Sequence, residues 1–409
     1  MRARWLCLIA LAAVSPGAAG CAGVGIQGAS EATGNQLAIY SSLPLQGPSA
    51  AASQQIVNGE RLALSEAGGR AGSFKVGYVS LDDSNPATGA LDPGVTATDA
   101  KMAAQDPSTI AYLGEYNSAA TAVSLPLINA AGILQVSPAS PYVGLTSSLD
   151  AGQDEPQRFY PSGRRTFGRL QPGDPAQAMA QAQLMKLLGV RKVYVLDDQN
   201  PFEIPLAQIV AGDAERAGIA VAAHDSVATT TGVVFTGEVE KIVHSGAQAV
   251  FFAGGTGAGT VALWRQLHGA DPRLLLLGSS TMVNESFASQ IGAASASTYL
   301  TTPALAPKEY PLSAGRMLTD YRRHFGGEPG PYALYGYEAM SVVLDAIRRA
   351  GSRGSDRQAV IDRFFAVRNR DSVLGRYSIE ADGETTLARY GVDRVVSGRP
   401  VFYRAIDGG

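Results

Sequence analysis

Cysteine is almost absent from this chain of 409 residues. Its two cysteines, Cys7 and Cys21, both lie within the first 21 residues. The rest of the chain therefore contains no thiol. This excludes disulfide bonds and catalysis by a cysteine nucleophile from the body of the protein.

Charged residues are also scarce, at 17% of the chain, and the formal net charge is −3. Because no basic stripe is present, we do not expect nucleic acid as a partner. No G-x-S-x-G nucleophile motif occurs, and the four histidines are scattered without metal-ligand spacing. We therefore expect no hydrolase site, no metal and no cofactor. Hydrophobic residues make up 45%, which is typical of a globular protein, and the length favours two domains.

The longest apolar run, residues 5–14, follows two arginines and is too short to span a bilayer. Residues 1–20 are therefore interpreted as a signal peptide. Ala18-Ala19-Gly20-Cys21 resembles the bacterial lipobox, in which the cysteine receives a lipid, although a larger residue such as leucine is usual in place of Ala18. The resemblance implies an exported protein, lipid-anchored at Cys21 on the extracytoplasmic face of the cell membrane. Ordinary secretion is the alternative. Residues 21–36, rich in Gly, Ala and Ser, are expected to form a flexible tether.

One stretch, residues 110–146, predicts the wall of a small-molecule site. Residues 110–113 form an apolar strand, and an Ala-rich helix begins at Ser118, with Asn117 or Ser118 as its N-cap. A second strand, residues 133–136, leads into the polar loop 137–141. Parallel sheets bind ligands at the edge where their strands end, and a helix N-terminus there favours an anionic group.

The remaining sequence repeats this alternation of strands and helices, which predicts an α/β fold with parallel sheets. Asp174 followed by proline predicts a helix with Asp174 as its N-cap. Residues 147–165 are polar and irregular, and are expected at a domain edge. Strands are predicted at residues 37–41, 74–81, 192–196, 218–223, 249–253, 274–277, 375–379 and 390–396, and helices at 54–66, 96–105, 174–188, 204–217, 234–245, 261–267, 331–350 and 356–367.

The order of these elements resembles the type I periplasmic binding proteins, and within them the leucine/isoleucine/valine-binding proteins of ABC importers. The resemblance covers residues 37–407 and rests on turns such as 43–47, Asp82-Asp83, 114–121 and Pro331-Tyr332-Ala333. It implies an α/β fold of two doubly wound parallel-sheet lobes, joined by a three-segment hinge and closing on a ligand. The implied lobes are residues 37–167 plus 303–374 and residues 168–302 plus 375–409.

The resemblance also implies a set of ligand-binding residues. In the first lobe, Ser118 at the helix start would hold a carboxylate, with Thr121 nearby. The second contact would come from Ala139, Ser140 and Pro141, although a threonine is usual in place of Pro141.

In the second lobe, Phe202 matches an aromatic contact, and Thr256 takes the place of another. Ser280 stands where the family has the acidic residue that pairs with an amino group. A buried ammonium without a charge partner is costly, so a branched-chain amino acid would need a substitute acid. Glu115, Asp198 and Glu285 are the candidates.

We therefore expect a monomeric solute-binding protein that is not an enzyme. It would deliver a small polar or anionic ligand, amino-acid-like or a carboxylate or amide, to an ABC permease. A ligand-sensing receptor component and an exported enzyme are the alternatives. The turn Gly255-Thr256-Gly257-Ala258-Gly259 also invites comparison with a dinucleotide site. It fails the fingerprint at Thr260 and lacks an acidic residue after the next strand.

Overall fold

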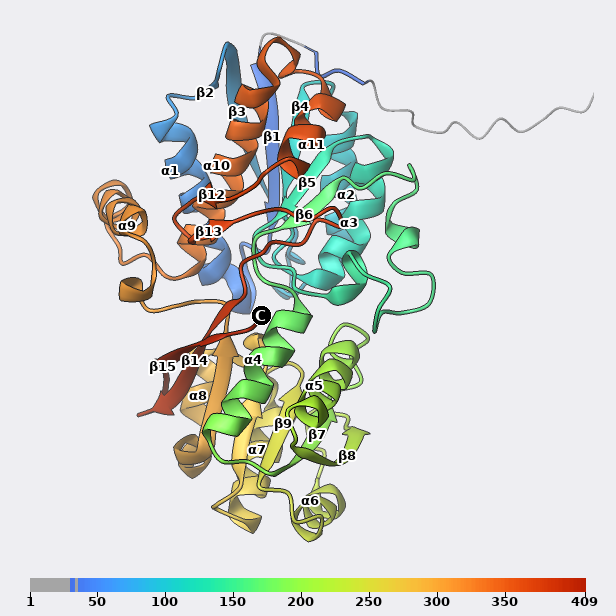
Figure 1. The fold of residues 1–409 in the computed structure, drawn as a ribbon, viewed down its shortest axis with the longest axis vertical. Helices are drawn as coiled ribbons and strands as arrows, with labels where there is room; N and C mark the ends of the chain where they lie inside the picture. Colours follow the sequence, from blue (N-terminus) through green and yellow to red (C-terminus); the bar gives the residue numbers. More distant parts are fainter. Residues whose placement is uncertain (1–29, 34–35) are drawn as a thin grey trace, which may run out of the picture.

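Two β-sheets, one in each lobe, organise the computed structural model, which describes residues 30–33 and 36–409. The lobes are stacked end to end, and helices cover the faces of each sheet (Figure 1). The predicted fold class, an α/β fold of two lobes built on largely parallel sheets, is confirmed by this architecture.

The first lobe is built on a six-stranded sheet with the order β2-β3-β1-β4-β5-β6. All its strands run parallel except the short edge strand β2. The strands are β1 (Gln36–Leu43), β2 (Arg70–Ala71), β3 (Phe74–Asp82), β4 (Thr109–Leu113), β5 (Leu134–Ser137) and β6 (Phe167–Arg169), and the helices between them are α1 (Ala50–Glu66), α2 (Pro93–Gln105) and α3 (Ser118–Ala130).

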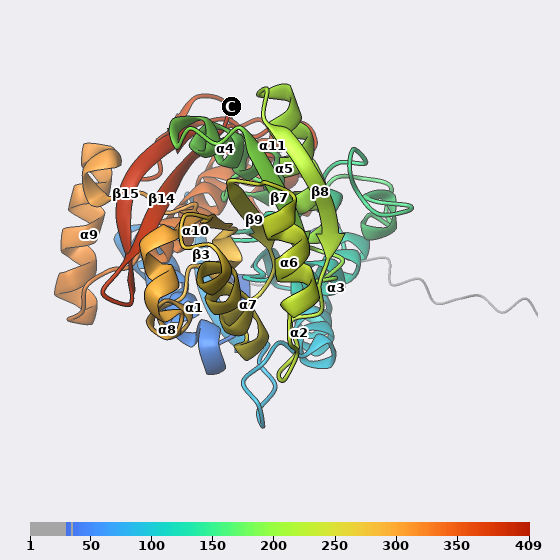
Figure 2. The same cartoon turned by 90° about the horizontal axis from the view of Figure 1, so that it is seen from below.

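Later parts of the chain complete this lobe. Helix α10 (Tyr332–Ala350) packs along α1, and α11 (Arg357–Phe365) packs on α10. A small hairpin of β12 (Arg370–Asp371) and β13 (Arg376–Tyr377) follows. Helix α9 (Leu312–Phe325) lies at the outer side of the molecule in two perpendicular views (Figures 1 and 2).

The second lobe has a seven-stranded sheet with the order β15-β14-β11-β10-β9-β7-β8, seen from below in Figure 2. Five neighbouring strands run parallel, namely β11, β10, β9, β7 and β8. The other two, β14 and β15, form an antiparallel edge. The strands are β7 (Lys192–Asp197), β8 (Ala220–Ser226), β9 (Ala249–Ala253), β10 (Leu275–Gly278), β11 (Thr298–Thr302), β14 (Arg389–Val396) and β15 (Arg399–Asp407), and the helices are α4 (Asp174–Leu187), α5 (Ile204–Arg216), α6 (Thr236–His244), α7 (Ala258–Ala270) and α8 (Glu285–Gln290).

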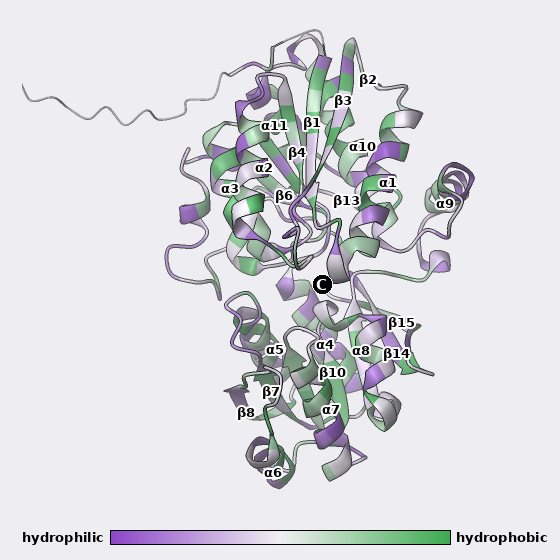
Figure 3. Ribbon diagram, turned by 180° about the vertical axis from the view of Figure 1, so that it is seen from behind, coloured by the Kyte–Doolittle hydropathy of each residue, from purple (hydrophilic) through white to green (hydrophobic). Residues whose placement is uncertain are grey.

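Buried apolar strands hold each lobe together. All residues of β4 and of β9 are buried, as expected for parallel strands covered on both faces. Figure 3 shows hydrophobic residues on strands such as β10, with hydrophilic residues on the outer turns of helices. The apolar runs that form β4, β9 and β10 were all predicted as strands from the sequence.

Seven of these elements were not predicted: the strands β2, β6, β11, β12 and β15 and the helices α8 and α9. The predicted N-cap Asp174 is also wrong, because Gly173 is the N-cap and Asp174 is the first helical residue. Within the described chain, no helix is long and apolar enough to cross a bilayer.

Three segments join the two sheets, running between residues 169 and 174, between 302 and 312, and between 377 and 389. The predicted lobe boundaries remain a proposal. Tyr377 lies just beyond the proposed boundary at residue 374, and its hydroxyl donates to Glu338 of α10 at 2.8 Å. This contact favours a lobe boundary that follows Tyr377.

Candidate functional site

A cleft of about 940 Å³ lies between the two lobes, where the carboxyl ends of the strands face each other. Helices α1, α3 and α10 begin at its first-lobe side, and α4 and α5 begin at its other side. Free backbone N–H groups at helix starts favour anionic groups. The arrangement is therefore suited to surround a small solute with several amide donors.

The start of α3 provides the first wall. Asn117 is the N-cap, and its side chain accepts from the N–H of Ala119 at 3.4 Å. Ser118 is half-buried, lines the cleft, and its Oγ accepts from the N–H of Tyr142 at 3.3 Å. The hydroxyl proton of Ser118 can therefore point to a ligand carboxylate, as the sequence suggested.

The loop after β5 provides the next part of the wall. Ala139 and Pro141 line the cleft. Ser140 and Thr121 are fully buried instead, and their hydroxyl oxygens lie 2.7 Å apart. Neither of these two belongs to the cleft lining, so we propose that they support the loop and affect a ligand indirectly.

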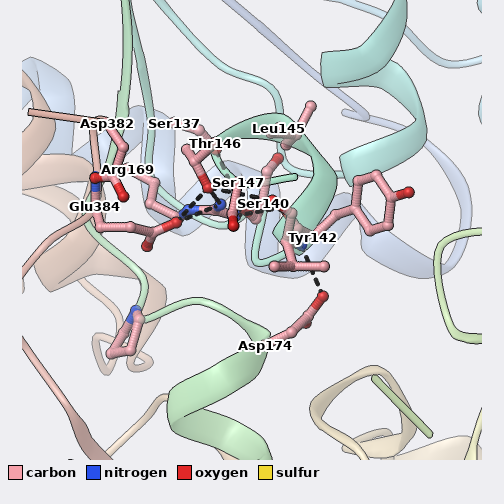
Figure 4. Close-up of polar contacts among 12 residues, drawn as sticks. Ser137, Ser140, Tyr142, Leu145, Thr146, Ser147, Arg169, Asp174, Asp382 and Glu384 are labelled. Atoms are coloured by element: carbon pink, nitrogen blue, oxygen red, sulfur yellow. Dashed lines mark hydrogen bonds and ion pairs between the residues drawn. The ribbon is translucent and has the colours of Figure 1, made fainter. Parts of the chain in front are cut away.

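Arg169 fixes this loop to the hinge (Figure 4). The fully buried guanidinium donates to the carbonyl oxygens of Ser140 and Tyr142, at 2.5 and 2.9 Å. It also donates to Thr146 Oγ1 and to Glu384 Oε1, both at 2.6 Å. Because Arg169 ends β6 and Glu384 lies in the last segment between the lobes, one buried cation joins two hinge segments to the ligand-facing loop.

The second lobe contributes Phe202, Thr256 and Ser280 to the lining, as the sequence predicted for their location. The Phe202 ring meets Tyr142 of the first lobe edge to face, with centroids 5.0 Å apart. Ser280 Oγ donates to Gln177 Oε1 at 3.1 Å, so this hydroxyl is already engaged within the second lobe.

Of the three substitute acids considered, only Glu285 lines the cleft, where it is exposed. Glu115 is fully buried and accepts from the hydroxyl of Tyr112 at 2.6 Å. Asp198 accepts from the N–H groups of Gly255 and Asn200, at 2.9 and 3.1 Å. Both carboxylates therefore accept from groups of the protein, and neither belongs to the cleft lining.

Two acids that the sequence analysis missed line the cleft: Asp174 and Glu203. Asp174 is 2% exposed, and one of its carboxyl oxygens accepts from the N–H of Val143 at 2.9 Å. Burial raises the pKa of Asp174 to about 7, although the Arg169 charge lowers it. Burial, and then the charge of Asp174, raise the pKa of Glu203 well above its usual range. The available signal for Glu203 was its place directly after Phe202, at a predicted helix start.

Residues 41–399 match the family model described as periplasmic binding protein. The chain belongs to this family.

Curated relatives of this binding protein cover nearly its whole length. It is 26% identical to the Leu/Ile/Val-binding protein homolog 3 of Brucella melitensis, over 88% of this chain and 91% of the relative. It is 23% identical to the amino acid binding protein of Pseudomonas aeruginosa, over 80% of each chain. These names support the leucine/isoleucine/valine-binding branch that the sequence predicted.

Solved structures agree with the fold of this binding protein. A leucine-binding protein of Thermotoga maritima superposes with a TM-score of 0.74 at 23% identity, covering 91% of this chain and 99% of that one. A solute-binding protein of R. palustris in complex with benzoate gives a TM-score of 0.69 at 14% identity, covering 90% and 96%. At these identities the likeness shows the fold alone.

Proposed function

We propose that this periplasmic binding protein captures an amino-acid-like solute between its lobes and presents it to an ABC importer. The observation that carries the proposal is the interlobe cleft, with the start of α3 and Ser118 on one wall and Phe202 on the other. The names of its relatives, which refer to leucine, isoleucine, valine and amino acids, support the same solute class.

Binding would work by replacing water around the solute. The α3 amides and the Ser118 hydroxyl supply donors for a carboxylate. The rings of Tyr142 and Phe202 supply apolar surface for a side chain, and closure of the lobes would exclude water from both contacts. In this account the protein binds the solute, and the permease recognises the closed form of the protein.

A thermal-shift screen of the purified protein against amino acids and small carboxylates tests the proposal. A ligand present at a hundred times its Kd stabilises the folded state by about 2.7 kcal/mol. We expect a rise of several degrees in the unfolding midpoint, and loss of most of that rise in Ser118→Ala.

Ser73→Ala is the matched control, because Ser73 is exposed and lies outside the cleft lining. It should keep the full ligand response. A ligand response that survives unchanged in Ser118→Ala would place the site elsewhere.

We also propose that a lipid on Cys21 anchors the protein. Cys21 and most of the predicted tether lie outside the described residues, but residues 30–33 lie against the first lobe. The N–H of Ala32 donates to the carbonyl of Ser355 at 2.7 Å, and Ala32 is buried. The tether that we propose would therefore end before residue 30 and reach at most about 30 Å.

Membrane fractionation of a Cys21→Ala variant tests the anchor, since the variant should be recovered in the soluble fraction.

A further inference from the structure

Residues 30–33, where the described chain begins, lie at the end of the first lobe that is opposite the cleft (Figure 1). The N–H of Ala32 donates to the carbonyl oxygen of Ser355 there, at 2.7 Å. The strands of the first-lobe sheet, apart from β2, run from this end towards the cleft. An attachment through Cys21 therefore reaches the fold at the end of the lobe that the solute does not enter.

Exposed cations gather at this attachment point. Two lie on the hairpin of β2 and β3, and three lie at the end of α10 and in the turn after it: Arg70, Lys75, Arg348, Arg349 and Arg353. The two segments are adjacent, since a Cβ on Gly72 would lie 3.9 Å from the Cα of Arg348. Arg353 directly precedes Gly354 and Ser355, the residue that binds Ala32. Together the five cations form a basic cluster beside the start of the described chain.

Ion pairs within the protein neutralise this cluster only in part. Arg348 and Arg349 share the carboxylate of Asp345. Arg353 pairs with Asp356. The side chains of the three arginines are 67%, 48% and 64% exposed, whereas the two carboxylate side chains are 5% and 18% exposed. The positive groups therefore point outward, and their carboxylate partners lie beneath them.

The two cations of the hairpin are less engaged still. Among the described residues, neither Arg70 nor Lys75 forms an ion pair, and Arg70 donates to the carbonyl oxygen of Ser73 at 2.6 Å. Two exposed acids also lie at this end: Glu31, which pairs with the segment after α10, and Glu66, which lines a surface hollow with Arg348. The basic cluster outnumbers these acids by five to two, although the whole chain has a formal net charge of −3.

We propose that the basic cluster docks on a membrane surface of anionic phospholipid headgroups. This rests on the proposed lipid on Cys21, which would hold this end of the protein within about 30 Å of the bilayer. Cations act on such a surface within about a Debye length, roughly 8 Å in physiological salt, so a short tether makes the contact effective. Docked in this way, the first lobe has its cleft end turned away from the bilayer, where a solute can enter.

Vesicle co-sedimentation of the full chain carrying Cys21→Ala tests the surface without its lipid. We expect binding at low salt to vesicles of equal parts phosphatidylcholine and phosphatidylglycerol, release at high salt, and no binding to phosphatidylcholine alone. In physiological salt the cluster by itself should be too weak to retain this variant on membranes. Adding Arg70→Gln and Lys75→Gln should lower the partition coefficient roughly thirtyfold, since each cation near an anionic surface contributes about fivefold.

Lys186→Gln combined with Arg191→Gln is the matched control, made in the same Cys21→Ala chain. It removes the same charge from exposed positions at the end of α4 and just before β7, at the far end of the second lobe (Figure 1). The control should bind vesicles like the parent chain. Thermal unfolding of each variant would check that it folds.

The outcomes separate this inference from the lipid anchor. Equal binding by the hairpin variant and the control, equal binding to both kinds of vesicle, or absence of binding to anionic vesicles overturns the docking surface, whatever fractionation shows of Cys21. Recovery of the wild type in the soluble fraction overturns the anchor instead. Vesicle binding that depends on Arg70 and Lys75 would then still support the docking surface.

Discussion

Asp83 shows how strongly the first lobe perturbs a single carboxyl group. It follows β3, is completely buried, and lies beside the carboxyl of Glu115. Burial raises the pKa of Asp83 to about 7; the contact with Glu115 lowers it, and the charges of Asp99 and Asp82 raise it, within that value. The folded protein therefore holds a proton that the unfolded chain releases near pH 4.

The sign of the resulting pH dependence follows from this raised pKa. The stability that Asp83 contributes is fully present below the pKa of the unfolded chain and is lost as the pH rises through about 7. We expect the free energy of unfolding of wild type to fall between pH 5 and 7, with a contribution from Asp83 approaching about 1.4 kcal/mol per pH unit. In Asp83→Asn this contribution should vanish. Urea unfolding at pH 5, 6 and 7 measures both slopes, and equal slopes would contradict the assignment.

At the residue scale, the sequence located the wall of the cleft but missed part of its chemistry. Ser118 could be placed because it follows a recognisable turn at a helix start, and Phe202 because the resemblance to the family implied an aromatic contact there. Asp174 was interpreted as a cap because aspartate before proline commonly has that role. The way its carboxylate contacts Val143 depends on how the two lobes meet. No local pattern records such a long-range contact.

The packing of α1 against α10 is the element-scale feature that sets the shape of the first-lobe wall. Both helices begin at the cleft, and two glycines let them approach closely. A Cβ on Gly336 would lie 2.2 Å from the carbonyl oxygen of Ile56, and a Cβ on Gly59 would lie 2.2 Å from that of Ala333. Neither backbone can yield without moving its helix.

We therefore expect Gly336→Ala to destabilise the protein by about 1–3 kcal/mol, the usual cost of overpacking. The variant should also bind solute more weakly, because the starts of α1 and α10 shift. Gly315→Ala in α9 is the control, since its Cβ meets nothing within 4 Å. It should be neutral or stabilising by up to about 1 kcal/mol, because alanine favours a helix. Chemical denaturation of both variants provides the comparison, and equal effects would contradict the packing argument.

Prediction of elements succeeded for strands that burial makes continuously apolar, and it failed for an exposed edge strand and for one amphipathic helix. The strands β4 and β9 are continuous apolar runs because both faces of a parallel sheet are covered. Helix α9 was missed although it carries an amphipathic pattern, since Ala314, Met317, Leu318 and Tyr321 are buried at helical spacing. Strand β15 is an edge strand, mostly exposed. Its signal was the tight turn at Ser397 and Gly398, both at positive φ, which joins it to β14.

At the scale of the whole molecule, the two lobes touch across the cleft through a ring pair. Tyr142 comes from the loop after β5, and Phe202 precedes α5. We infer that the lobes rotate about the hinge and that this contact is lost when they open. The Tyr142 hydroxyl donates to Glu155 at 2.5 Å, which holds this ring in place from the first lobe. The pair therefore contributes to the stability of the closed arrangement relative to an open one.

Phe202→Ala should shift the molecule towards open forms. An edge-to-face pair contributes about 1 kcal/mol beyond the area that it buries, which corresponds to roughly a fivefold increase in the Kd of a solute that requires closure. Small-angle X-ray scattering should show a larger radius of gyration for ligand-free Phe202→Ala than for wild type, and a larger decrease when saturating solute is added. Phe325→Ala is the control, because Phe325 packs on Tyr321 at the end of α9, outside the cleft lining. If Phe202→Ala and wild type had the same radius of gyration with and without solute, the ring pair would have no part in closure.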